Sequence, residues 1–377
     1  MIQTALTLAL LVGAGLLIRT MHNVANVKSG YSIDRILTMT VTAVQGDWAD
    51  FHVRALERVS RVPGVQQAAF AWGTPLTGND WPGLLEIEGH PVTQPSDRIA
   101  VPLRSVTPGY FALLGLAIDD GRDFRSTDDR KAPAVAVVNR AFADRYFGGT
   151  TAIGKRVWAN GRDRPATEII GVAGNARTGD LTQAPAPEVY LSFWQANAFS
   201  KDLIVRTAAD PRSAIEAIRR ELRVVDSTVA VEHVKTLDDI RTDSLASRIF
   251  ARQLLVGFSI VGTLLTVIGV YGVLALSVAS RRREIAIRTA IGADRRDIRN
   301  LVFGEGFRLV AGGIVLGIAG AIMTSRVLQS FLFEVEPGDP ATLAGAGLLF
   351  VGVTLLACWA PTRRAAAVDP IEALRCE

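Results

Sequence analysis

Apolar residues in this chain gather into four long runs without a charged side chain. The runs are Met1–Ile18, Gln253–Ser280, Leu309–Ser325 and Ala341–Thr362. A helix rises about 1.5 Å per residue, so about 20 residues cross the roughly 30 Å hydrocarbon core of a bilayer, and each run is near that length. The pattern predicts membrane spans at residues 1–22, 253–280, 309–326 and 341–362.

Two other interpretations of these runs remain open. A run could form the core helix of a soluble protein, which suits the short first and third runs best. The first run could also be a signal peptide, although no basic residue precedes it and no clear cleavage site follows it. We expect an anchor there, because four such runs are unusual in a soluble chain.

Charge distinguishes the connections between the last three runs. The connection after the second run carries Arg281, Arg282, Arg283, Arg288, Arg295, Arg296 and Arg299, whereas the next carries Glu334, Glu336 and Asp339. Because cytoplasmic loops are rich in Lys and Arg, the first connection and the tail 363–377 are predicted in the cytoplasm and residues 23–247 outside it. No basic residue precedes the first span, so we expect a helix truncated at its N-terminus.

The polar segment between the first two runs predicts a mixed α/β domain at 23–240. A helical pattern at 47–61 precedes a strand candidate at 65–71. The same order returns near the end of the segment, with a helix at 211–223 and a strand at 228–234. These two units predict a split α/β subdomain that is closed by its first and last segments.

The middle of this domain is rich in strands and turns. Apolar runs at 134–138 and 168–172 are typical of buried strands, and a helical pattern at 140–146 follows the first of them. We therefore predict an inserted strand-rich subdomain at about 78–187, reached through a Gly- and Pro-rich loop at 73–83.

One segment of this inserted subdomain has the residue spacing of a nucleotide-binding motif. Gly149–Lys155 has the G-x-x-x-x-G-K spacing of a phosphate-binding loop, but Arg156 follows where Ser or Thr should bind magnesium. The segment also follows a helical pattern and leads into an extended one, whereas a phosphate-binding loop joins a strand to a helix. We interpret it as a turn and expect no nucleotide there.

The histidines and cysteines do not form the pattern of a catalytic or metal site. The histidines are scattered, at His22, His52, His90 and His233. Their spacing does not suit a metal site, and Cys358 and Cys376 both lie near the C-terminus. The net charge of +4 comes with basic residues clustered beside an apolar run rather than on a folded face, which argues against nucleic acid. We expect no catalytic residue, metal or cofactor, and no enzyme activity in this chain itself.

The basic connection at 281–300 carries the most informative local pattern. A short helix is predicted from Arg283 to Ile291, Gly292 suits a left-handed C-cap, and Asp294 suits the cap of a following helix. A loop that needs only positive charge would not require two caps, so we interpret it as a protein-binding element. A basic loop lying on anionic lipid is the alternative.

Glycines in the third run suggest close helix packing. Gly313 and Gly317 form a Gly-x-x-x-Gly pair, which places two small residues on one face of a helix. We name both as candidate helix-packing residues.

Several segments together resemble the FtsX/MacB-type permeases of ABC transporters. The basic connection (RRREIAIRTAIGADRRD, 281–297) and the tail (APTRRAAAVDPIEALR, 360–375) resemble the signature ends of that family. The external segment resembles its periplasmic core domain at 106–124, 135–147, 153–155, 169–174 and 187–190. The chain is also similar to the duplicated permeases of acidobacterial type.

This resemblance implies an α-helical four-span transmembrane domain with a large mixed α/β periplasmic domain inserted between the first and second spans. The MacB-like core would occupy 23–240 and the stalk and FtsX-like domain 241–377, with a helical stalk at Leu237–Arg252. It also implies the permease subunit of an ABC-type efflux or mechanotransmission complex in the bacterial inner membrane. ATP hydrolysis by a separate cytoplasmic ABC ATPase would move the periplasmic domain.

The resemblance further implies a cytoplasmic coupling loop at 281–300. The residues expected to bind the ATPase are Arg282, Arg283, Glu284, Ile285, Ile287, Arg288 and Ile291. The other expected partners are membrane lipids, an identical or homologous permease unit, and a periplasmic or outer-membrane protein. Two alternatives remain: a non-transporting envelope signalling or scaffold protein that regulates a periplasmic enzyme, and a membrane-anchored enzyme. The sequence does not identify a substrate.

Overall fold

The computed structural model of the chain divides into two compact units. Residues 1–26 and 246–377 form one, here called the helical unit, and residues 27–245 form the other, here called the α/β unit. The structure describes residues 2–25, 27, 29–43, 48–77, 81–148, 150–159, 165–196, 200–280, 312, 315–323, 325–326, 332–336 and 338–366.

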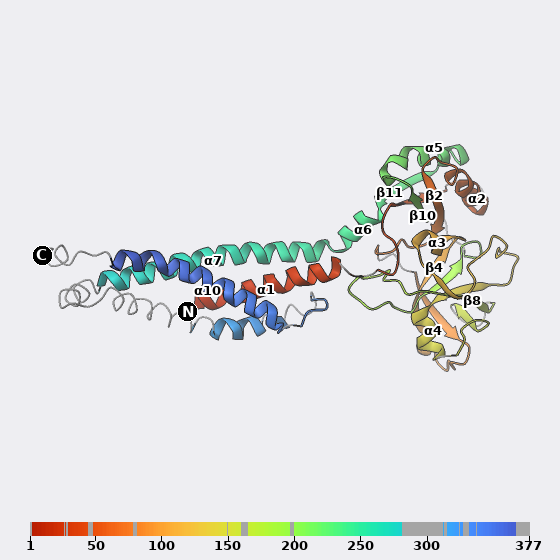
Figure 1. The fold of residues 1–377 in the computed structure, drawn as a ribbon. Coiled ribbons are helices and arrows are strands. Elements are labelled where there is room, and N and C mark those ends of the chain that lie inside the picture. The colour runs from red at the N-terminus through yellow and green to blue at the C-terminus, as the bar shows by residue number, and fades with distance from the viewer. Residues whose placement is uncertain are drawn as a thin grey trace, which may run out of the picture. The chain divides into compact units, whose positions relative to one another are not determined.

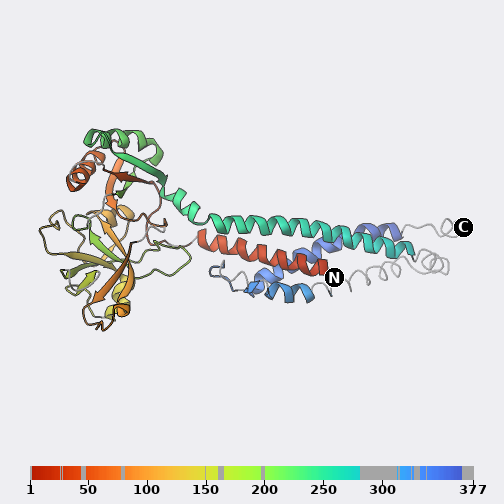
Figure 2. The same ribbon diagram turned by 180° about the vertical axis from the view of Figure 1, so that it is seen from behind.

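Besides a shorter helical segment at 315–323, three long helices build the described part of the helical unit. They are α1 (Ile2–Ala25), α7 (Ala246–Ser280) and α10 (Pro340–Ala366). The three pack against one another and lie side by side in both views (Figure 1, Figure 2). An apolar cluster in this unit buries Leu8, Val12 and Leu16 of α1, Phe350 of α10, and Ala321 of the helical segment 315–323.

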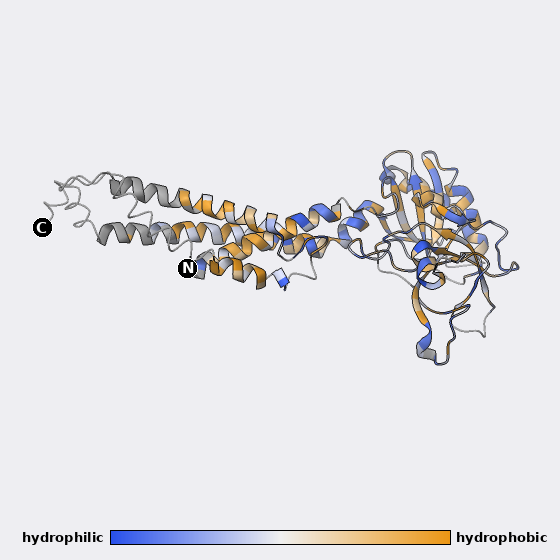
Figure 3. Ribbon diagram, turned by 60° about the horizontal axis from the view of Figure 1, so that its bottom comes forward, coloured by the Kyte–Doolittle hydropathy of each residue, from blue (hydrophilic) through white to orange (hydrophobic). Residues whose placement is uncertain are grey.

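Apolar residues dominate these helices (Figure 3). Among the described residues, Ala5–Val24 and Arg248–Gly269 are long and apolar enough to cross a membrane, and Pro340–Val353 is a shorter apolar helix. The predicted span at 309–326 is described, as helix, only at 312, 315–323 and 325–326. The arrangement of four spans therefore stays a prediction.

The α/β unit contains the sheet and its covering helices. The strands are β1 (Ile36–Thr42), β2 (Val65–Ala71), β3 (Trp81–Ile87), β4 (Ile99–Val106), β5 (Ile118–Gly121), β6 (Val135–Asn139), β7 (Arg156–Ala159), β8 (Thr167–Ala173), β9 (Val189–Ser192), β10 (Ser200–Thr207) and β11 (Ala230–Thr236). The helices are α2 (Trp48–Val59), α3 (Tyr110–Leu114), α4 (Arg140–Phe147), α5 (Ile215–Val225) and α6 (Leu237–Ser244), with 3₁₀ turns at Pro95–Asp97 and Pro211–Ala214.

One half of the sheet joins the first and last segments of the unit. Its strands follow the order β11-β1-β10-β2, and every neighbouring pair is antiparallel. Two units, β1-α2-β2 and β10-α5-β11, thus interleave as in the split βαβ arrangement of ferredoxin-like folds. Helix α2 packs against α5 and buries Phe51, Ala55 and Val59, which are four residues apart and so share one helical face.

The other half of the sheet closes on itself. The order continues through β4-β3-β7-β8-β6-β9, and β9 pairs with β4 as well as with β6. The resulting ring surrounds its own apolar core, which includes Leu103, Val138 and Ile169. A single register pair, Ala71 with Val106, joins β2 of the first half to β4 of the ring.

A helix break separates α6 from α7. Thr236 caps α6 through a capping box with Asp239, and the Leu245 N–H closes the last turn on Thr242 O at 3.1 Å. Helix α7 then begins at Ala246. The stretch 237–252, which the resemblance implies as a stalk, is therefore divided between two helices.

The described part of the segment that has phosphate-binding-loop spacing, residues 150–155, contains a turn. Gly154 has φ 80°, and the Lys155 N–H donates to Ala152 O at 3.2 Å. Strand β7 follows at once from Arg156, which agrees with the predicted turn and extended segment.

Candidate functional site

The predicted ATPase-coupling residues cannot be placed in the fold, because all lie outside the described residues. They are Arg282, Arg283, Glu284, Ile285, Ile287, Arg288 and Ile291. Gly313 also lies outside. The coupling role therefore stays a prediction from the sequence.

Gly317 is described, and it lies against α1. A Cβ atom at Gly317 would lie 2.9 Å from Leu8 Cβ and 3.3 Å from Ala5 Cα. Across another contact, a Cβ at Gly15 of α1 would lie 2.8 Å from Thr342 Cγ2 of α10. Glycine thus allows close approach of α1 to two neighbouring helical segments.

Neutral hydroxyl groups also join the helices. Thr7 Oγ1 of α1 lies 2.9 Å from Thr266 Oγ1 of α7 and donates a hydrogen bond to Gly262 O at 3.1 Å. Near the other end of α1, Arg19 forms an ion pair with Asp339, the residue just before α10. The end of α1 and the start of α10 therefore lie together.

The α/β unit buries formal charges where its two halves meet. Arg104 of β4 is 1% exposed; its Nη1 donates to Gly73 O at 2.6 Å, and its Nε lies 3.7 Å from Glu188 Oε1. Tyr190 Oη donates to Glu188 Oε2 at 2.6 Å, and Thr178 Oγ1 donates to Oε1. Burial raises the pKa of Tyr190 well above its usual value, so this hydroxyl keeps its proton.

A second buried cation lies on β10. Lys201 is 1% exposed; its Nζ donates to Ser105 Oγ at 2.6 Å and lies 4.5 Å from the centre of the Phe193 ring. Burial lowers the pKa of Lys201 to about 7 and that of the nearby buried His52 to about 4. Both side chains are thus held in surroundings that favour their neutral forms.

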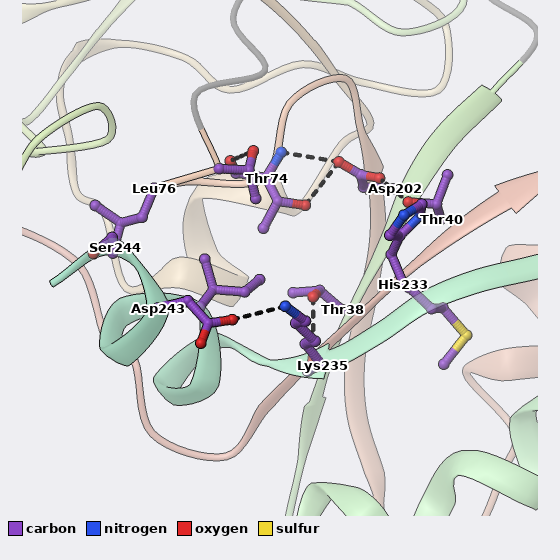
Figure 4. A pocket seen from close by; sticks show the side chains of 12 residues that line it. Thr38, Thr40, Thr74, Leu76, Asp202, His233, Lys235, Asp243 and Ser244 are labelled. Carbon is purple, nitrogen blue, oxygen red and sulfur yellow. Dashed lines mark hydrogen bonds and ion pairs between the residues drawn. The ribbon is translucent and has the colours of Figure 1, made fainter. Parts of the chain in front are cut away.

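A cavity of about 440 Å³ opens in the α/β unit, and we take it as the candidate site. Strands β1, β10 and β11 form one wall, the loop 74–77 a second, and α6 a third (Figure 4). Its charged lining residues are Asp202, Lys235 and Asp243. A volume in this range is typical of pockets for small ligands.

Hydrogen bonds fix the position of Asp202 in the wall. Thr40 Oγ1 donates to its Oδ1 at 2.9 Å. The Thr74 N–H and Oγ1 donate to its Oδ2 at 2.9 and 2.7 Å. Across the opening, Lys235 Nζ donates to Asp243 Oδ2 at 2.7 Å (Figure 4).

Unusual backbone conformations occur at the same cavity. Leu76 has φ 68° and His233 has φ 48°, in a region that residues other than Gly seldom adopt, although Asn, Asp and His adopt it more often than the rest. His233 lies at a bulge in β11, where the register against β1 shifts between Thr38 and Thr40. Such conformations persist where surrounding contacts hold them, and they are common at ligand-binding sites.

Sequence reasoning missed this cavity. Strand β10, loop 74–77 and α6 are distant in the chain, and their charged residues have no motif spacing. One signal was visible for the buried cluster: Arg104 is a lone charged residue in an otherwise uncharged strand, Ile99–Val106. Among the described residues, no group of three or more His, Cys, Asp or Glu side chains lies close enough to hold a metal ion.

Two family models match the chain. The model described as MacB-like periplasmic core domain matches residues 2–225. The model described as FtsX-like permease C-terminal matches residues 256–370.

Two named proteins are similar to the chain over most of its length. YknZ of Bacillus subtilis (strain 168), named an uncharacterized ABC transporter permease, is 28% identical over 330 residues, or 80% of this chain and 79% of the relative. The macrolide export ATP-binding/permease protein MacB of Neisseria gonorrhoeae is 24% identical over 318 residues, or 82% of this chain and 47% of the relative. The chain thus spans about half the length of MacB.

The chain also aligns with a solved structure. The periplasmic region of MacB from Actinobacillus actinomycetemcomitans aligns with a TM-score of 0.39 and 14% identity. The alignment covers 60% of this chain and 97% of the solved chain.

Proposed function

Because the chain belongs to the family that joins a MacB-like periplasmic core domain to an FtsX-like permease C-terminal domain, we propose that it is the permease subunit of an ABC-type export system. The observation that carries this proposal is the succession of the two matches, which together cover almost the whole chain. The relatives described above are named as a permease and as an export ATP-binding/permease protein. The chain would lie in the bacterial inner membrane with the α/β unit outside the cytoplasm.

In this proposal a separate cytoplasmic ABC ATPase supplies the energy. The ATPase would bind the loop 281–300 and drive movement of the α/β unit through α6 and α7. A second permease unit, identical or homologous, would complete the complex, and a periplasmic or outer-membrane partner would contact the α/β unit.

One contact within the helical unit supports the proposed orientation. Arg19 and Asp339 form an ion pair, so the end of α1 and the connection before α10 lie on the same side. The charge pattern of the connections places both outside the cytoplasm. The proposed topology of four spans satisfies this pairing without any charged group crossing the bilayer.

The test is co-purification of the full chain with an ABC ATPase from the native host. We expect the ATPase to bind and to be lost when Arg283→Glu and Arg288→Glu are combined, since both reverse charge in the predicted coupling helix. Arg364→Glu is the control, because it reverses a basic residue in the tail, outside the predicted coupling residues.

The outcomes separate the possible functions. An ATPase that binds equally well to the double variant contradicts the coupling role of these arginines. If no ATPase binds and an envelope hydrolase co-purifies instead, the chain is a regulatory scaffold and the proposed export function is wrong.

A further inference from the structure

The hydroxyl groups around the cavity all direct their protons into the protein. Those of Thr40 and Thr74 bond to Asp202, and that of Thr77 bonds to Thr74 O at 2.7 Å. Thr38 Oγ1 donates to Lys235 O at 3.0 Å, and Ser244 Oγ donates to Arg241 O at 2.7 Å. A hydroxyl has one proton and two lone pairs. These side chains therefore offer a ligand only acceptor atoms.

The charge of the lining agrees with its acceptors. Asp202 and Asp243 contribute two carboxylates and Lys235 one ammonium, so the wall carries a net charge of −1 with His233 counted as neutral. Asp202 accepts three hydrogen bonds from the protein, and a carboxylate has about four acceptor positions. The remaining acceptor positions and the negative charge favour a ligand that donates hydrogen bonds and carries positive charge.

We propose that this cavity binds a small organic cation, an alkylammonium or guanidinium compound with an apolar part. The cationic group donates to Asp202 and to the threonine oxygens, and the apolar part contacts Leu76 and Ile240, which line the same space. An organic cation fits better than a metal ion, because the cavity brings together only two carboxylates and the described residues form no metal cluster.

Binding at this place would hold α6 against the sheet. Asp202 belongs to β10, whereas Ile240 and Asp243 belong to α6. The ligand would compete with Lys235 for Asp243, whose ion pair is half exposed, with side chains 49% and 61% exposed. The ligand therefore replaces a weak ion pair by a bridge between strand and helix.

The test is calorimetry on the full chain in lipid nanodiscs, with empty nanodiscs as the blank. The probes are 4-phenylbutylamine and 4-phenylbutanol, which differ in the ammonium group and match in size. We expect saturable binding of the amine at one site and at least tenfold weaker binding of the alcohol. Equal binding of the two probes overturns the proposal.

Variants locate the binding. Asp202→Asn removes the fixed carboxylate, and we expect at least tenfold weaker binding of the amine. Because Asp202 also supports the Thr74 backbone, Asp243→Asn on the exposed rim is the second variant, with an expected loss of about threefold or more. Lys235→Gln removes the competing cation, and we expect binding to become about threefold tighter.

The control is Asp238→Asn on the same helix. Its side chain is 71% exposed and does not line the cavity, so amine binding should stay unchanged. Weaker amine binding after Lys235→Gln would contradict the proposal, because Lys235 would then support binding of the cation instead of competing with it for Asp243. The measurement needs no ATPase, so its result and that of the co-purification are independent.

Discussion

The two units of this chain bury polar groups in different ways. The helical unit uses neutral hydroxyls, such as the Thr7–Thr266 pair, and close approaches at glycine. The α/β unit buries the pair of Arg104 and Glu188, together with a second basic side chain, Lys201, whose Nζ donates to Ser105 Oγ. A charge in the bilayer interior costs far more than in a water-soluble domain, so the proposed membrane location explains the difference.

Removing the Arg104 side chain tests how much buried charge contributes to the stability of the α/β unit. We expect it to have the largest effect of the variants described here. Arg104→Ala leaves Glu188 buried without its cation and Gly73 O without a donor. Loss of one partner of a buried pair typically costs about 3–5 kcal/mol, so we expect a reduction of that size in the free energy of unfolding. Thermal unfolding of the full chain, followed by tryptophan fluorescence, measures it.

Arg54→Ala is the matched control for this variant. Arg54 pairs with Asp50 at the surface of α2, with side chains 55% and 61% exposed. Exposed pairs contribute little, so the expected change is below about 0.5 kcal/mol. If the two variants lowered the free energy of unfolding equally little, the buried pair of Arg104 and Glu188 would not stabilise the contact between the two halves of the sheet.

The buried lysine predicts a dependence of stability on pH. Folding lowers the pKa of Lys201 to about 7 from an ordinary value of 10.5. Between these two values the unfolded chain binds more protons, so stability rises with pH across that window and falls as pH drops toward 7. At 1.36 kcal/mol per pKa unit, we expect a gain of about 2–3 kcal/mol between pH 7.5 and 9.5.

Two substitutions identify the source of this pH dependence. Lys201→Met should abolish most of the gain between pH 7.5 and 9.5. Lys235→Met should preserve it, since Lys235 is 49% exposed and its hydrogen bond to Asp243 raises its pKa instead. An unchanged profile after Lys201→Met would show that other groups produce the gain.

Adding a methyl group at a glycine contact tests how much close helix packing contributes to the stability of the helical unit. We expect this change to have the smallest effect. Gly317→Ala places a methyl group 2.9 Å from Leu8 Cβ, so α1 must move slightly. Overpacking costs about 1–3 kcal/mol, and for a single methyl group we expect the lower end. Loss of helical circular dichroism during titration with sodium dodecyl sulfate measures the change.

Gly257→Ala provides the control for this last variant. Nothing lies within 4 Å of a Cβ built at Gly257 on α7, so we expect equal or slightly higher helix stability. A similar loss for both variants would indicate a general response to alanine and would contradict specific packing at Gly317.

Local patterns predicted individual elements of the α/β unit well. The strand expected at 65–71 is β2, Val65–Ala71, because Pro63 and Gly64 separate it clearly from the preceding helix. The last strand, expected at 228–234, lies at Ala230–Thr236. Its bulge at His233 and the capping of α6 by Thr236 set this boundary, and both depend on neighbouring segments.

The closed ring and the cavity were beyond sequence reasoning for a related reason. The pairing of β9 with both β4 and β6 depends on three-dimensional closure, which alternation within one strand does not reveal. Asp202 and Asp243 meet at one cavity only after β10, β11 and α6 have assembled. The coupling loop 281–300, by contrast, is predicted from local pattern and resemblance, and it lies outside the described residues.

Closure of the ring also bears on how the α/β unit avoids pairing its strands with those of another molecule. Strand edges invite pairing with other molecules, and a closed ring removes them. Along the described strands, β11 ends the sheet order, and it carries a bulge together with Glu232 and Lys235. A bulged, charged edge pairs poorly with a copy of itself. The bulge and the two charged side chains thus make β11 a poor edge for pairing with a second copy of the chain.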